Sequence, residues 1–108
     1  SVTPNRARDI VAAIWATISG TAQYDWAGGL IWYQAEGEAD GAGRSAMRAA
    51  LAGHGGGHAT LVRASEDVRR VVDVFEPQPA PLAALSARVK ESFDPRHILN
   101  PGRMYEGV

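Results

Sequence analysis

The residues best suited to do chemistry lie near the end of the chain, at Asn100-Pro101-Gly102. Proline fixes φ at one turn position and glycine permits a positive φ at the next, so these residues predict a tight reversal. A reversal of this kind presents backbone N–H groups and one polar side chain, here the Asn100 amide, which both donates and accepts hydrogen bonds. The spacing therefore predicts a small contact site for something specific.

An amphipathic helix is expected to position this reversal. The helix would start near Pro81, and its apolar residues recur at intervals of three, four and four: Leu82, Leu85, Val89 and Phe93. This spacing places them on one face, which we expect to be buried. Asp94-Pro95 follows the helix and can start a further short turn before the reversal.

Two more helices are expected upstream. The first begins at Thr3-Pro4, with a capping hydroxyl and proline at the first helical position, and ends at Ser19-Gly20. Its apolar stripe is built on residues four apart: Ile10, Ile14 and Ile18. The second helix covers residues 44–51. Its inward residues are expected to be Met47, Ala50 and Leu51.

Strands are predicted at residues 30–33 and 58–64, where β-forming residues gather, with a loop over 36–43 between the first strand and the second helix. Ser65 is expected to cap a short helix through Arg70, and residues 71–75 fit either a strand or a helix end. The element order is α-β-α-β-(α)-α, which indicates the α+β class. Two strands are too few to form a stable sheet alone, so we expect further strands from a longer parent chain or a second copy. The first residue, which is serine and not methionine, fits an excised piece.

Composition limits the classes of function. The chain has 108 residues, which is one domain at most, and its 45% hydrophobic content is that of a globular protein. A net charge of −1 gives no electrostatic footprint for nucleic acid or an anionic membrane. The absence of cysteine excludes disulfides, iron–sulfur ligation and thiol catalysis by this chain, and fits a reducing compartment. No apolar run reaches the ~18 residues of a membrane helix.

Other candidate sites are weaker. His54 and His58 are four residues apart, but metal ligation at this spacing needs a helix, which the intervening Gly55-Gly56-Gly57 disfavours. The same glycines follow a helix and precede a strand, which is the wrong orientation for a phosphate-binding loop. We therefore predict no metal site. The four aromatic residues at 24, 26, 32 and 33 fit core or interface packing, and a part in lining a substrate pocket stays open.

The end of the chain resembles the carboxy-terminal pattern of the FAD-linked oxidases of the vanillyl-alcohol oxidase type. The pattern runs from Lys90 through Phe93-Asp94-Pro95 and residues 98–102 to Arg103. Further similarity upstream, at residues 24–29, 57–61 and 77–82, is greatest to the glycolate oxidase type. The resemblance implies that residues 1–108 form a small α+β cap domain, with helices on an antiparallel sheet related to ferredoxin-like folds. Its segment 94–104 would return to an FAD-binding domain upstream.

The resemblance also implies the cofactor-binding residues, which are Asn100, Pro101, Gly102 and Arg103. Asn100 would offer its amide near the flavin ring or pyrophosphate, and Gly102 would allow close approach of the backbone. Arg103 would pair with phosphate or with the electron-rich edge of the flavin, because a guanidinium group stabilises anionic oxygen. The alternative is that Pro101-Gly102 only turns the chain and Arg103 is solvated. No catalytic residue is identified.

The function implied is FAD-dependent oxidation of a 2-hydroxy acid such as glycolate by a longer parent protein. FAD would be bound by that parent and not by this fragment alone, which we expect to be inactive. Expected partners are a second flavin subunit and an iron–sulfur subunit, in a bacterial complex that is cytoplasmic or held at the inner membrane through those subunits. Two alternatives stay open: a non-catalytic interaction module that uses its sheet edge and a Trp15/Trp32 surface, and a flavin oxidase with a different alcohol substrate.

Overall fold

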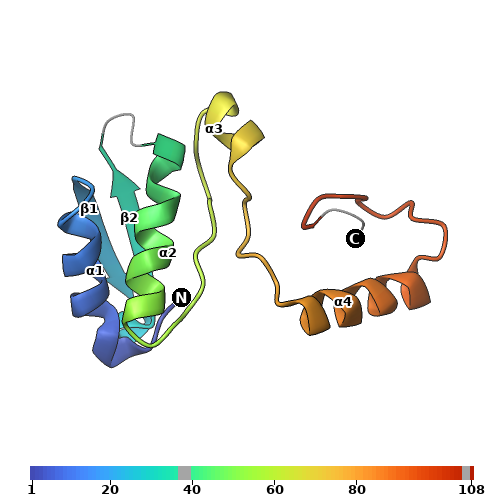
Figure 1. Ribbon diagram of the computed structural model, residues 1–108, viewed down its shortest axis with the longest axis horizontal. Helices are drawn as coiled ribbons and strands as arrows, with labels where there is room; N and C mark the ends of the chain where they lie inside the picture. The colour runs from blue at the N-terminus through green and yellow to red at the C-terminus, as the bar shows by residue number, and fades with distance from the viewer. Residues whose placement is uncertain (37–39, 106–107) are drawn as a thin grey trace.

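The computed structural model describes residues 1–36, 40–105 and 108. Its elements follow in the order η1 (Pro4–Arg6), α1 (Ala7–Trp15), β1 (Gly20–Asp25), η2 (Trp26–Gly28), β2 (Leu30–Ala35), η3 (Asp40–Gly43), α2 (Arg44–Gly53), α3 (Glu66–Val71) and α4 (Ala80–Phe93), where η marks a 3-10 helix (Figure 1). Strands β1 and β2 form a two-stranded antiparallel sheet on which helices pack. This confirms the predicted α+β class.

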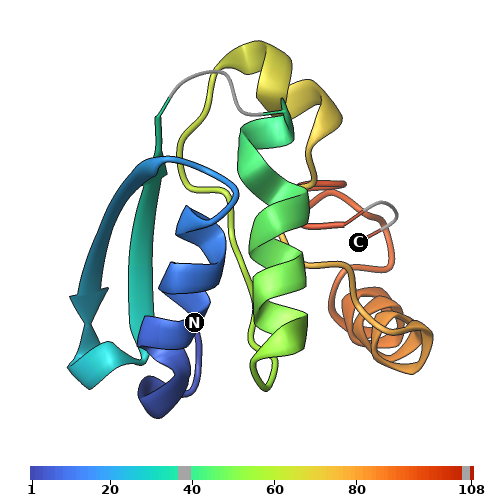
Figure 2. The same cartoon turned by 60° about the vertical axis from the view of Figure 1, so that its left-hand side comes forward.

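The amino-terminal half is a hairpin covered by two helices. Residues of β1 pair with those of β2 from Gly20 opposite Ala35 to Asp25 opposite Leu30. Helices α1 and α2 lie side by side on one side of this hairpin (Figure 2). The strand predicted at 30–33 is confirmed as part of β2, but β1 was missed. Its residues alternate between apolar and polar side chains, but they include no large aliphatic residue, and the strand is stabilised by its pairing with β2.

The core of this half is built as the helix patterns predicted. Ile10 is 1% exposed and packs with Ile14, Ala50 and Leu51. Met47 and the β2 residues Ile31 and Tyr33 pack against this cluster. The apolar stripe of the first helix and the inward residues of the second are therefore confirmed.

The first helix is shorter than predicted, because α1 ends at Trp15 and not near Gly20. Ile18 is nevertheless buried, and its N–H still donates to the carbonyl oxygen of Ile14 at 2.8 Å. Beyond it the chain must turn into β1, and the Tyr33 hydroxyl donates to the carbonyl oxygen of Ile18 at 2.6 Å. A tertiary hydrogen bond thus stabilises this turn after the helix end.

The strand predicted at residues 58–64 is wrong, since this segment has no regular structure. Two hydrogen bonds join the backbones of Ser1 and His58, at 2.8 and 3.1 Å, and Leu61 donates to Val74 at 2.8 Å. These bonds are isolated, so no ladder forms along the segment. The apolar and β-branched residues alone do not make a strand without a neighbour to pair with.

The short helix capped by Ser65 is confirmed as α3, although the Ser65 side chain makes no capping hydrogen bond. Residues 72–79 have no regular structure. Part of the predicted loop over 36–43 lies outside the described residues, and Asp40–Gly43 forms η3. No helix within residues 1–36, 40–105 and 108 has the length and apolarity needed to span a membrane.

Helix α4 begins at Ala80, one residue before Pro81, which confirms its predicted start. Its apolar face, however, is exposed and not buried. The exposed fractions are 47% for Leu82, 47% for Leu85, 50% for Val89 and 84% for Phe93. The spacing correctly placed these residues on one helix, but the described chain leaves about half or more of each side chain uncovered. Figure 1 shows α4 standing apart from the α1–α2 half.

The core and the α4 face should respond differently to truncation. We expect Ile10→Ala to lower the free energy of unfolding by about 2–5 kcal/mol, because it leaves a cavity in the core. Leu85→Ala in the same chain should change it by less than about 0.5 kcal/mol, as at other exposed positions. Urea denaturation followed by circular dichroism measures both. Equal losses for the two variants would contradict the exposed placement of α4.

Candidate functional site

The predicted reversal at Asn100-Pro101-Gly102 is present. The Arg103 N–H donates to the carbonyl oxygen of Asn100 at 3.3 Å, and Gly102 has a φ of +68°. This is the arrangement expected for a turn with proline followed by glycine. Gly102 also donates to the carbonyl oxygen of Val108 at 3.0 Å. All four predicted site residues are exposed, so their side chains are accessible to a ligand.

A buried carboxylate, that of Asp94, sets the path of the chain from α4 to this turn. Asp94 is only 4% exposed, and its two oxygens accept from the N–H groups of Ile98 at 3.1 Å and Leu99 at 2.8 Å. Its backbone carbonyl accepts from the N–H of His97 at 3.0 Å, which confirms the short turn expected at Asp94-Pro95. One residue therefore orders residues 95–99, the five that follow it.

Lys90 balances the charge of Asp94. Its Nζ lies 2.8 Å from Asp94 Oδ2 and also donates to the carbonyl oxygen of Leu99. Its hydrogen bond, followed by that from the Leu99 N–H, lowers the pKa of the Asp94 carboxyl from 3.8 to about 2. Sequence reasoning treated Asp94 only as a turn former. The signal that identifies the pair is a lysine four residues before an aspartate at the end of a helix.

The tail is attached to the amino-terminal half through residues 73–76. The Tyr105 ring lies 6.0 Å from the Phe75 ring, and the Tyr105 hydroxyl donates to the carbonyl oxygen of Glu76 at 3.3 Å. Two α2 arginines hold the other side of this segment. Arg44 pairs with Asp73 at 2.9 Å, and Arg48 pairs with Glu76 at 3.0 Å. A continuous set of contacts therefore runs from α2 to the tail.

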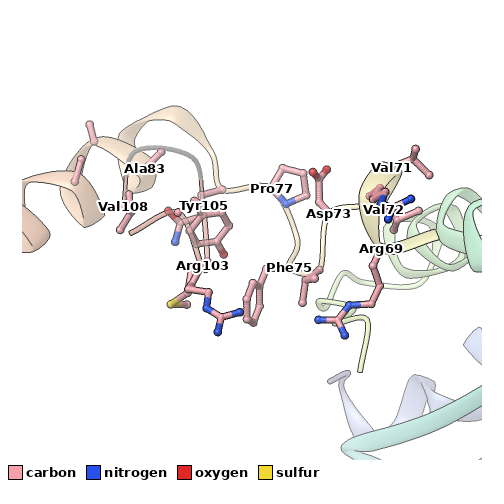
Figure 3. A pocket seen from close by; sticks show the side chains of 17 residues that line it. Arg69, Val71, Val72, Asp73, Phe75, Pro77, Ala83, Arg103, Tyr105 and Val108 are labelled. Atoms are coloured by element: carbon pink, nitrogen blue, oxygen red, sulfur yellow. The ribbon is translucent and has the colours of Figure 1, made fainter. Parts of the chain in front are cut away.

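A cleft of about 820 Å³ separates the tail and α4 from α3 and the segment after it. Its wall includes Phe75 and Tyr105 together with Ala83, Ala84 and Ala87 of α4, and Figure 3 shows the side chains that line it. Of the predicted site residues, Gly102 and Arg103 border this cleft. Asn100 instead lines a smaller hollow of about 360 Å³, which it shares with Arg103 and Lys90. Arg103 borders both spaces, and Pro101 borders neither.

The histidines and tryptophans considered in the sequence lie elsewhere. His54 Nδ1 donates to the carbonyl oxygen of Ala50 at 2.9 Å. In the described part of the chain, no three histidine, aspartate or glutamate side chains come close enough together to hold a metal ion. Trp15 Nε1 donates to the carbonyl oxygen of Gly20 at 2.9 Å, at one end of the hairpin, whereas Trp32 pairs with Gln23 in its middle.

The order of residues 94–99 should depend on pH through Asp94. Because folding lowers the pKa of its carboxyl, the stabilisation is complete above about pH 4 and is lost as the pH falls through about 2. Hydrogen exchange of the Ile98 and Leu99 amides, followed by NMR, should accelerate over this window. Asp94→Asn should accelerate their exchange already at pH 7. Asp9→Asn, at an exposed carboxyl of α1, should not.

Comparison with known proteins relates the chain to one subunit of an oxidase. It is 34% identical over 88 residues to glycolate oxidase subunit GlcE of Escherichia coli (strain K12). The aligned region covers 82% of this chain and 22% of that protein, so the chain spans about a fifth of the length of this relative. No family model matches the chain. No solved structure matches it either.

Proposed function

We propose that residues 1–108 form the carboxy-terminal cap domain of an FAD-dependent 2-hydroxy-acid oxidoreductase of the glycolate oxidase type. The similarity to glycolate oxidase subunit GlcE supports the enzyme class. The observation that supports the site is the exposed turn at Asn100–Arg103, which follows the ion pair of Lys90 with the buried Asp94. In this proposal, segment 94–104 returns to an upstream FAD-binding domain and completes the flavin pocket.

The residues of the turn fit an anionic, ring-bearing cofactor. Within the described residues, neither the Asn100 amide nor the Arg103 guanidinium group makes a side-chain hydrogen bond or ion pair. Both groups are therefore free to donate to phosphate or to flavin oxygen. Gly102 has open space around the position a Cβ would take, while its positive φ favours glycine, so the backbone can approach a ligand closely.

Each residue of the turn has a distinct part in this proposal. FAD, when bound, supplies the chemistry of accepting a hydride from the α-carbon of the substrate. Asn100 orients the cofactor through its amide, and Pro101 fixes the turn that presents it. Arg103 places a positive charge beside the cofactor, which tunes its electronics. None of these residues is assigned as a catalytic acid or base.

The exposed face of α4 supports the proposal that this domain packs against more protein. Leu82, Leu85, Val89 and Phe93 of α4 are exposed, as are Ile98 and Leu99 on the tail. Exposed apolar side chains that gather on one helix face often mark a surface that binds other protein. Burial of one such side chain contributes about 1.5–3 kcal/mol. We propose that the upstream FAD-binding domain covers this face. The second flavin subunit, the iron–sulfur subunit and attachment to the inner membrane through them belong to the same proposal.

A second candidate function rests on the exposed tryptophans. Trp26 is 79% exposed, Trp15 52% and Trp32 47%, which is unusual for this residue type. The domain would then be an interaction module whose hairpin surface docks a partner subunit, and the Asn100 turn would be chemically inert.

Substitutions in the full-length parent separate the two functions. Asn100→Ala should reduce FAD content or turnover several-fold if the turn contacts the flavin, at about 1 kcal/mol for one lost hydrogen bond. Trp32→Ala should leave both unchanged. The reverse pattern, with normal flavin and lost subunit assembly in Trp32→Ala alone, would support the interaction module. Absorbance at flavin wavelengths and size-exclusion chromatography measure the two properties, and the isolated 108-residue chain should show no flavin absorbance.

The proposed packing of the FAD-binding domain on α4 is tested by placing a charge on the apolar face of this helix. Val89→Asp should leave the folding of the isolated chain unchanged, because Val89 is half exposed there. In the full-length parent it should lower the melting temperature or the soluble yield, since a buried unpaired carboxylate is costly. Arg88→Asp, at the neighbouring exposed position, is the control and should be tolerated in both. If both variants are tolerated in the parent, α4 is not the covered face.

A further inference from the structure

We propose that Arg69 and Arg103 form a two-arginine oxyanion site in the large cleft beside Phe75. Arg69 lies on α3 and Arg103 on the tail, and both line the same cleft. In Figure 3 their guanidinium groups lie on either side of the Phe75 ring and extend toward the same side of the cleft. The inference rests on the proposed function in one respect, since Arg103 belongs to the turn proposed to contact the flavin.

The other charged groups around this cleft are already engaged. Arg70, the neighbour of Arg69, contacts Glu66 at 3.4 Å and Asp67 at 3.3 Å. Asp73, which also lines the cleft, pairs with Arg44 at 2.9 Å. Within residues 1–36, 40–105 and 108, Arg69 and Arg103 take part in no ion pair. Other arginines of these residues are also in no ion pair, but of those that line the cleft Arg69 and Arg103 are the two whose charge no carboxylate side chain balances.

The rest of the lining indicates what kind of ligand would carry the anion. Phe75 and Tyr105 provide a tilted aromatic pair, with centroids 6.0 Å apart, and Ala83 and Ala87 provide an apolar wall. A planar ring can stack on the aromatic side chains while its oxyanion pairs with the two guanidinium groups. The oxyanion is either the phosphate of a ring-bearing cofactor, which would use both the arginines and the aromatic pair, or the carboxylate of a 2-hydroxy acid, which would use the arginines alone. Both groups use the same bidentate chemistry with arginine.

The site can be tested on the isolated 108-residue chain, without flavin. Inorganic pyrophosphate and oxalate are titrated separately at low ionic strength, and amide signals are followed by NMR. We expect saturable shifts at Arg69, Arg103 and Tyr105. Because both arginines are exposed, Arg69→Gln and Arg103→Gln should each weaken binding by about two- to fivefold. Added NaCl should weaken it further by screening.

Arg63→Gln is the matched control. Arg63 is exposed and lies outside the cleft, and its substitution by glutamine removes the same charge. Tighter binding of pyrophosphate supports a phosphate ligand, and tighter binding of oxalate supports a carboxylate. If Arg63→Gln weakens binding as much as Arg69→Gln, or if neither anion shifts the cleft signals, the oxyanion site is refuted. This outcome is independent of FAD content in the Asn100→Ala parent, so either proposal can fail alone.

Discussion

The position of the carboxy-terminal segment depends on one ion pair, between Nζ of the partly buried Lys90 and Oδ2 of the buried Asp94 at 2.8 Å. The helix spacing puts the two side chains on adjacent turns, and the tail wraps around them by donating two N–H groups to Asp94 and accepting from Lys90 at Leu99. Neither charge is left without a partner, as a buried charge requires. The turn at Asn100–Arg103 begins where these bonds end, so its position follows from theirs.

A second set of contacts joins the tail to the rest of the molecule. The Tyr105 side chain contacts residues 75 and 76, and two arginines of α2 hold residues 73–76. These contacts are mostly polar and partly exposed, in contrast to the apolar packing around Ile10. The cleft is therefore enclosed by surfaces that are connected through side-chain contacts and not through a shared core.

Local pattern was a reliable guide where a short stretch determines its own structure. The turn residues of Asn100-Pro101-Gly102 and the core stripe around Ile10 and Ile14 are examples, because proline, glycine and helical spacing act within a few residues. Long-range pairing was not predictable in this way. Residues 58–64 look like a strand but have no neighbour that pairs along them, while Gly20–Asp25 looks unremarkable and pairs fully with β2. The spacing in α4 correctly grouped four apolar residues on one helix, but whether these residues are buried depends on other parts of the protein that pack against the helix. For the site, the sequence indicated the turn but not Arg69, since only the tertiary structure brings α3 to the same cleft.

The connection between α3 and α4 carries Pro77 and Pro79, separated only by Gln78. Proline restricts φ and favours an extended polyproline conformation, so this part of the connection is a semi-rigid linker and not a flexible one. Because α2 holds the earlier part of the connection at Asp73 and Glu76, the distance from there to α4 depends on the backbone of residues 77–79. The two sides of the cleft would then keep the same separation before and after a ligand enters from solvent, and binding would require little rearrangement of the chain.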